Sequence, residues 1–173
     1  MNETLQVLKS RRSCRKFTDQ KLDPETLAEI LEAGTWAPTG RNRQSPLIVM
    51  VQDEETLAEL DALNAKARGR GETHAFFGAP AVAVVFADSE SHTGLQDASL
   101  VMGNLMNAAH SCGVGSCWLN RARDVFEMEE GRALMKKWGV PDNYVGFANC
   151  ILGYPSGNLP APRPRKEGYI IYI

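Results

Sequence analysis

A run of cations near the start of the chain, RRSCRKF at positions 11–17, combines guanidinium donors with a hydroxyl group. Arg11, Arg12 and Ser13 are consecutive, and forked guanidinium donors beside a hydroxyl suit a phosphate better than a carboxylate. Each charge-assisted hydrogen bond to such an anion contributes about 1.5–3 kcal/mol. Taken alone, the run is better explained as a solvated surface patch, and only together with the other clusters does it indicate an anion site.

Two further polar clusters stand on segments with loop composition, APTGRNRQ at 37–44 and PRPRK at 162–166. The amides of Asn42 and Gln44 offer donors and acceptors, as needed to bind the edge of a heterocycle such as the pyrimidine ring of a flavin. Turn chemistry at Asn42 is the simpler alternative. Arg163 and Arg165 would complete an anion pocket with the first run if the C-terminal segment passes beside it.

A glycine-containing stretch, GVGSCW at 113–118, resembles the dinucleotide-binding fingerprint but lacks its third glycine, because Trp118 takes that position. What remains is a backbone whose N–H groups at Ser116, Cys117 and Trp118 can approach a ligand closely. Cys117 has no histidine in a recognisable partner motif, so we predict a buried apolar residue there and no nucleophile.

Composition excludes several classes of function. The chain has 19 basic and 21 acidic side chains, which argues against nucleic acid as a partner. No signal peptide and no bilayer-length apolar stretch are present in the sequence, so we expect a cytoplasmic protein with free thiols. The three histidines do not have zinc-ligand spacing, and we expect no metal site.

The elements that must position these clusters indicate an α+β fold, with helices around a mixed, mostly antiparallel sheet in a single domain of 173 residues. The apolar patterns predict helices at 2–10, 24–34, after Asp53 and at 92–111, and strands at 47–52, 81–87, 113–120 and 144–152. Residues 125–138 are amphipathic. The helix at 92–111 contains only one acidic or Lys/Arg residue, Asp97, so we expect it to be enclosed on most sides.

The C-terminal segment has an unusual composition. Residues 155–164 include four prolines, and the β-prone sequence GYIIYI follows at 168–173. A proline-rich arm holds an extended form at about 3.1 Å per residue, so it can carry the last strand far from the core. Such a strand must pair with a sheet edge. It either folds back on its own sheet or is exchanged with a second subunit, and we favour exchange.

In the order of these segments, the chain resembles the FMN-dependent nitroreductase family. The similar stretches extend over nearly the whole chain: RRSCRKF, the helix at Pro24 leading to APTGRNRQ, FFGAPAVAVV, the Asp97 helix leading to GVGSCW, and ILGYP before the basic arm. The resemblance implies a nitroreductase-like sandwich. It also implies a homodimer with FMN at the interface, in which the arm at 155–173 embraces the partner.

The resemblance also implies roles for individual residues. Those expected at the phosphate and ribityl chain of FMN are Arg11, Arg12 and Ser13, with Arg163 and Arg165 near the phosphate. Those expected at the ring are Arg15 near N1 and O2, Asn42 and Gln44 from the other subunit, and the backbone of Ser116, Cys117 and Trp118 facing N5. Of the remaining residues of the first run, we expect Cys14 and Lys16 to face elsewhere and Phe17 to anchor the run in the core.

The implied activity is that of an NAD(P)H oxidoreductase. NADH or NADPH would reduce FMN and leave, and a nitroaromatic, a quinone or another electron-poor acceptor would then react at the same face. Arg15 is the residue expected to tune this chemistry, since a fixed cation near N1 stabilises the reduced flavin anion. Three alternatives stay open: an FMN carrier or sensor with little turnover, a reductase for one dedicated metabolite, and a protein that binds some other phosphate.

Overall fold

The fold is built on one antiparallel sheet of four strands, seen in a computed structural model that describes residues 2–69, 71 and 74–173. The strand order is β1-β2-β4-β3. The strands are β1 (Leu47–Val51), β2 (Ala81–Asp88), β3 (Gly115–Leu119) and β4 (Tyr144–Gly153). Every neighbouring pair of strands is antiparallel. The predicted α+β class and the mostly antiparallel sheet are therefore confirmed.

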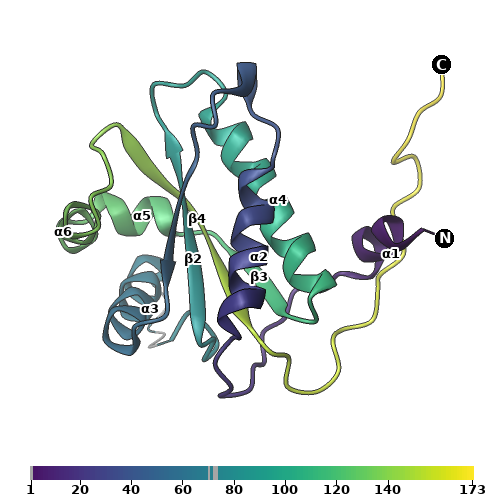
Figure 1. Cartoon of the computed structure of the whole chain (residues 1–173), viewed down its shortest axis with the longest axis horizontal. Helices are drawn as coiled ribbons and strands as arrows, with labels where there is room; N and C mark the ends of the chain where they lie inside the picture. Colours follow the sequence, from purple (N-terminus) through teal and green to yellow (C-terminus); the bar gives the residue numbers. More distant parts are fainter. Residues whose placement is uncertain (1, 70, 72–73) are drawn as a thin grey trace.

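Helices cover both faces of this sheet, as Figure 1 shows. The alternation of side chains along β2 explains why both faces must be covered, since successive residues of a strand point to opposite sides. Ala83 and Val85 belong to the core shared with α2 and α4, whereas Val84 and Phe86 belong to the core on the other face. All of Ala81–Ala87 is at most 1% exposed, as the uninterrupted apolar run predicts.

The helices begin where the sequence places their capping residues. Asn2, Asp23 and Asp53 each accept a hydrogen bond from the backbone N–H three residues later. The helices are α1 (Glu3–Ser10), α2 (Pro24–Thr35), α3 (Glu54–Arg68), α4 (Gly94–Ser111), α5 (Ala122–Glu127) and α6 (Glu129–Lys137), with a 3-10 turn, η1 (Gly40–Asn42).

The amphipathic stretch at 125–138 is divided between two helices. Met128 has an extended backbone with ψ of 159° and separates α5 from α6. Gly131 explains the tight junction, because a Cβ atom at this position would collide with the carbonyl oxygen of Val125. The apolar period alone does not reveal this break, since both short helices face the same core.

The chain after β4 leaves the body of the protein. Figure 1 shows it as an extended segment that ends far from the sheet. Residues 169–173 form no strand and are exposed, so the strand predicted at 168–173 is absent from the single chain. The alternative in which this end folds back on its own sheet is wrong. The apolar end pairs with no strand of the described chain, and exchange between subunits stays a prediction.

Among the described residues, no helix is both long and apolar enough to span a membrane.

Candidate functional site

The run at 11–17 follows α1 and is tied to the sheet by its backbone. Ser13 forms a parallel bridge with Ser116 of β3, and the Cys14 N–H donates to the Ser116 carbonyl at 2.8 Å. Phe17 forms an antiparallel bridge with Pro155. The structure thus brings together the predicted residues Arg11, Arg12, Ser13 and Arg15 and the predicted segment of Ser116, Cys117 and Trp118, about a hundred positions later in the chain.

The side chains of Cys14 and Phe17 face the core, as expected for the anchor Phe17, and Lys16 faces solvent. Cys14 is 2% exposed, and Phe17 packs partly buried against the core on the α3 side, whereas Lys16 is exposed. Gly115 permits the close contact of the run with β3, because a Cβ atom there would lie 2.8 Å from the Cβ and Sγ atoms of Cys14. The run is therefore fixed by packing, and its arginines are held at the surface beside it.

The two first arginines form an electropositive site. Among the described residues, neither Arg11 nor Arg12 makes an ion pair with a carboxylate. Arg12 donates only to the backbone carbonyls of Lys9 and Arg11. His110 of α4 lies beside them, with its Nε2 atom 2.7 Å from the Ser10 hydroxyl. Burial lowers the pKa of His110, and the charges of Arg11 and Arg12 lower it further.

Arg15 separates two cavities. One cavity of about 250 Å³ is lined by backbone and side chains of Ser13 to Lys16 and of the chain at 156–160. The other, also about 250 Å³, lies beside Arg15, Asn64, Phe77, Trp118, Asn120 and Arg121. We call the second one the Arg15 cavity. The Arg15 guanidinium carbon lies 6.0 Å from the centre of the Phe77 ring, within the range of a cation–π contact.

The β3 segment contributes a buried hydroxyl and an aromatic wall. Ser116 is 1% exposed, and its Oγ atom has no hydrogen-bond partner in the described structure. Trp118 is half-buried, with its ring edge against Phe147 and its Nε1–H donating to Asn120 at 2.7 Å. Cys117 is fully buried in the core, where the sequence predicts it. This thiol therefore does not face either cavity as a nucleophile.

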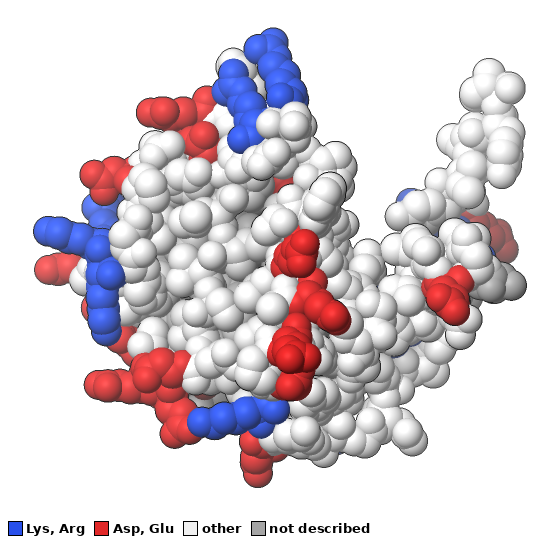
Figure 2. Space-filling view, viewed as in Figure 1, with Lys and Arg blue, Asp and Glu red and all other residues white. Residues whose placement is uncertain are grey.

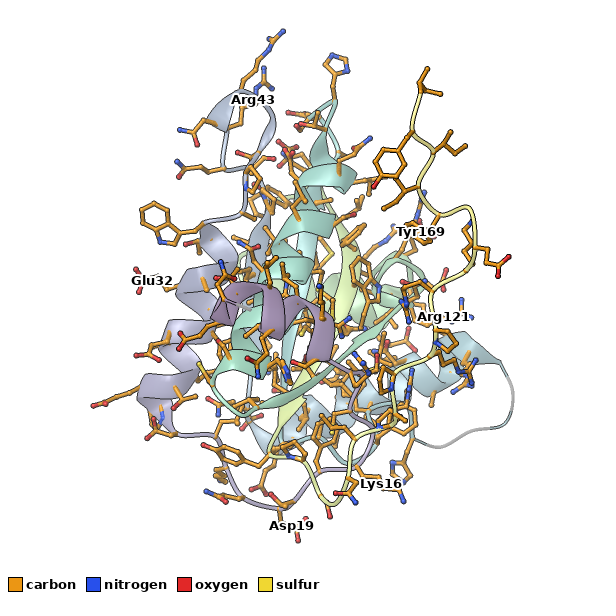
Figure 3. All side chains as sticks on the ribbon, turned by 90° about the vertical axis from the view of Figure 1, so that its right-hand side faces the viewer. Lys16, Asp19, Glu32, Arg43, Arg121 and Tyr169 are labelled. Carbon is orange, nitrogen blue, oxygen red and sulfur yellow. The ribbon has the colours of Figure 1, made fainter. Side chains whose placement is uncertain are left out.

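Asn42 and Gln44 lie at the other end of the molecule. Figure 3 shows Arg43 of their loop and Lys16 of the first run at opposite ends of the molecule. Arg43 and Arg41 contribute to the basic side chains that gather over η1 in Figure 2. One chain therefore does not bring these amides to Arg15. Their predicted role requires a second subunit.

The η1 loop is nevertheless rigidly built. Arg41, Asn42 and Gln44 all have positive φ angles, between 51° and 55°. Residues other than glycine rarely adopt this backbone conformation. The carboxylate of Asp97, which is 3% exposed, accepts hydrogen bonds from the loop at Gly40 N–H (3.0 Å) and Ser45 Oγ (3.4 Å). The single acid in the charge-poor helix α4 thus fixes this loop.

Arg163 and Arg165 are exposed on the extended C-terminal segment. Arg165 donates to the backbone carbonyl of Arg163 at 2.7 Å. Within the described residues, no hydrogen bond joins this pair to the cations at 11–13. Like the amide loop, the pair requires another chain or a different course of the segment to reach a phosphate there.

Seven residues that line the Arg15 cavity were not predicted: Asn64, Arg68, Ala75, Phe77, Leu119, Asn120 and Arg121. Asn64 is 2% exposed on α3, where its amide donates to the Leu60 carbonyl and accepts from Asn149 at 2.8 Å. A polar residue on the inward face of an amphipathic helix was the available signal. Phe77, Asn120 and Arg121 lie in connections between elements, and no periodicity marks them.

The residues of the site fit a ligand with an anionic end and a planar ring, which is the chemistry of FMN. Arg11 and Arg12 lack carboxylate partners, and an anion would provide their missing acceptors. Ser116, whose hydroxyl has no hydrogen-bond partner in the described structure, lies on β3 and is bridged to Ser13, the residue after these arginines. The Arg15 cavity supplies amides and aromatic rings suited to a heterocycle. Within the described residues, no three His, Cys, Asp or Glu side chains gather as metal ligands would.

An antiparallel sheet between two helical layers, with this site at the edge strand β3, defines a class of α+β proteins. A family model described as "Nitroreductase family" matches residues 8–154. The chain belongs to the nitroreductase family, which confirms the resemblance inferred from the sequence.

Similar proteins of known name or structure are found in several organisms. An Archaeoglobus fulgidus protein with the provisional name NADH dehydrogenase/NAD(P)H nitroreductase is 33% identical over 90% of this chain and 87% of its own. The FMN reductase (NADPH) of Bacillus subtilis is 26% identical, over 99% of this chain and 73% of its own. A crystal structure of a nitroreductase with bound FMN from Bacteroides fragilis covers 100% of both chains, with 29% identity and a TM-score of 0.93.

Proposed function

We propose that this chain is an FMN-dependent NAD(P)H oxidoreductase of nitroreductase type, whose 173 residues form one FMN-binding domain that works as a homodimer. The observation that carries the proposal is the position of Arg15, which closely follows Arg11 and Arg12 in the chain and lines a cavity of amides and aromatic rings. The nitroreductase relatives that bind FMN or are named FMN reductases support the choice of cofactor.

The cations and the hydroxyl at 11–13 would hold the phosphate and ribityl chain. The bridge between Ser13 and Ser116 supports this assignment, since it fixes the run against the strand whose backbone would face the ring. Ser116, Cys117 and Trp118 would approach that ring through backbone groups. Arg11 and Arg12 would lose little side-chain conformational freedom on binding a phosphate, because both side chains are half-buried and already restrained.

Arg15 would act on the ring electrostatically. Its permanent positive charge stabilises negative charge that develops at N1 and O2 on reduction, and it does so without donating its proton. When bound, FMN supplies hydride transfer in two half-reactions, first from NADH or NADPH and then to a nitroaromatic, a quinone or a similar acceptor. The protein itself needs no side-chain acid or base at the reacting centre.

A second subunit would complete the site. Asn42 and Gln44 would reach the flavin of the partner from the rigid η1 loop, and Arg163 and Arg165 would approach a phosphate along the C-terminal arm. Exposed apolar side chains on α1 and α4, including Leu8 and Leu95, and on the arm from Tyr169 to Ile173 support such an assembly. Isolated exposure of this many large apolar groups is costly in water.

The visible spectrum of the purified protein, followed by anaerobic addition of each nicotinamide, tests the proposal. We expect a yellow protein whose oxidised-flavin absorbance disappears within the time needed to mix in NADH or NADPH by hand. A colourless protein that takes up no FMN on titration contradicts the proposal. A coloured protein that stays oxidised indicates a carrier or sensor instead. Reaction with only one compound from a panel of nitroaromatics, quinones and enones indicates a dedicated reductase.

A further inference from the structure

Phe77 has a backbone conformation that its side chain disfavours. Its φ angle is +56°, in the left-handed region where bulky residues are outliers. The neighbouring Gly78, with φ of +70°, adopts the same region without this penalty. The Phe77 side chain is 41% exposed, so burial of the ring offers little compensation in folding. A strained and exposed aromatic residue therefore calls for an explanation outside the stability of the chain.

The surrounding chain forces Phe77 into this position. The carboxylate of Asp61 on α3 accepts hydrogen bonds from the backbone N–H groups of Ala75 and Phe76, the latter at 2.7 Å. The Phe76 side chain is 2% exposed in the core, and its carbonyl accepts from Ala79 N–H at 3.0 Å. The segment is thus anchored on both sides of Phe77, and the ring of Phe77 lines the Arg15 cavity.

Phe77 lines the Arg15 cavity together with Arg15, Asn64 and Trp118, and the Arg15 guanidinium carbon lies 6.0 Å from the centre of the Phe77 ring. The walls of the cavity also include Arg68 and Arg121. Two aromatic rings, three guanidinium groups and a buried amide on the walls of one cavity suit a planar, electron-poor ring that carries partial negative charge.

We infer that Phe77 is a binding residue whose ring packs against a planar aromatic ring in the Arg15 cavity, and that its backbone strain is retained for this purpose. The inference rests on the proposed function for the source of that ring. The ring belongs either to FMN itself or to an aromatic substrate beside it, and both share the same recognition chemistry.

Substitution of Phe77 by glycine separates binding from stability. Phe77→Gly removes the ring and also relieves the left-handed backbone, so the thermal midpoint measured without added FMN should be equal to or above that of the wild type. Binding should weaken by about tenfold, the loss expected for one aromatic pair. A role in structure alone predicts the opposite, a lower midpoint with unchanged binding.

Three variants serve as controls. Phe77→Tyr retains the ring and should bind like the wild type. Phe77→Ala removes the ring but keeps the left-handed backbone. Its ligand binding should be as weak as that of Phe77→Gly, and its thermal midpoint should be lower than that of Phe77→Gly. Asp61→Ala releases the segment from α3 and should lower the midpoint and the binding together.

Two measurements identify the source of the ring. Quenching of FMN fluorescence on titration with protein reports flavin binding, and the KM for p-dinitrobenzene at saturating NADH and FMN reports binding of an aromatic substrate. A tenfold change in the first assigns the ring to FMN, and a change in the second alone assigns it to the substrate. If Phe77→Gly changes neither, the inference is wrong although the proposed function stands. If the wild type takes up no FMN, the proposed function is wrong and this inference falls with it.

Discussion

Two arginine-containing segments of this chain, at 11–17 and at 162–166, have similar composition but different structural settings. The first is bound to the sheet by bridges from Ser13 to Ser116 and from Phe17 to Pro155. The second is exposed along its whole length, and within the described part of the chain its arginines make one hydrogen bond, from Arg165 to the Arg163 carbonyl. Segments of similar charge are thus held against the sheet at 11–17 and exposed on the extended arm at 162–166.

Backbone pairing accounts for this difference. The backbone around 13–18 forms hydrogen bonds with Ser116 and with residues at 154–156. One of them runs from the Thr18 N–H to the Tyr154 carbonyl at 2.9 Å. The arm has prolines at 160, 162 and 164, which cannot donate backbone hydrogen bonds. Charge therefore indicates what a segment can bind, whereas the supply of amide donors decides whether it is held in place.

The largest effect should follow removal of the arm. Deletion of residues 160–173 removes a segment that is exposed in the single chain, so the remaining protein should fold with a nearly unchanged far-ultraviolet circular dichroism spectrum. If the arm embraces a partner, the deletion should convert a stable dimer to a monomer in sedimentation experiments. FMN binding should weaken at least tenfold.

The matched control is the full-length double variant Arg163→Gln and Arg165→Gln. It removes the charges but keeps the apolar end, so it should remain dimeric and lose only part of the FMN affinity. A truncated chain that stays dimeric and binds FMN like the wild type would show that the arm contributes to neither.

A smaller effect should distinguish two residues within the first run. Arg11→Gln should weaken FMN binding by about 10- to 150-fold, the equivalent of one charge-assisted hydrogen bond of about 1.5–3 kcal/mol. Arg15→Gln should slow flavin reduction by NADH or NADPH more than it weakens FMN retention, because its charge acts on the reduced ring. Equal effects of the two substitutions on both measurements would contradict the division of roles.

Much of the fold was predictable because local chemistry determines it. The capping residues Asn2, Asp23 and Asp53 mark helix starts, and the uninterrupted apolar run at 81–87 requires a strand buried on both faces. The division of 125–138 into two helices was not predictable, because it depends on the contact of Gly131 with the carbonyl of Val125. Such a contact exists only in three dimensions.

The site was predictable only in part, for a similar physical reason. Residue type indicated Arg11, Arg12, Ser13 and Arg15, and the fold does place them beside Ser116 and Trp118. Phe77 was not found, since its significance depends on a positive φ angle imposed by Asp61. Asn42, Gln44, Arg163 and Arg165 were chosen for their chemistry, yet one chain leaves them apart from the cavity, so their position depends on assembly.

The smallest effect concerns His110, which can report the charge around the first run. Burial and the guanidinium groups of Arg11 and Arg12 lower its pKa, so the folded protein takes up this proton less readily than the unfolded chain. The contribution of neutral His110 to stability is therefore present above the ordinary pKa of about 6.5 and is lost as the pH falls through the lower folded value. Between those values, urea-unfolding midpoints should rise with pH, and His110→Gln should reduce that slope.

Substitution of a neighbouring cation tests the cause. Arg12→Gln removes one of the two charges, so the pKa of His110, followed by proton NMR, should rise toward its ordinary value. Arg43→Gln is the matched control, because it removes an arginine at the opposite end of the molecule and should leave the His110 titration unchanged. Binding of FMN should also raise the pKa of His110 if the phosphate neutralises Arg11 and Arg12. An unchanged titration in holoprotein would place the phosphate elsewhere and break the contrast between the two segments.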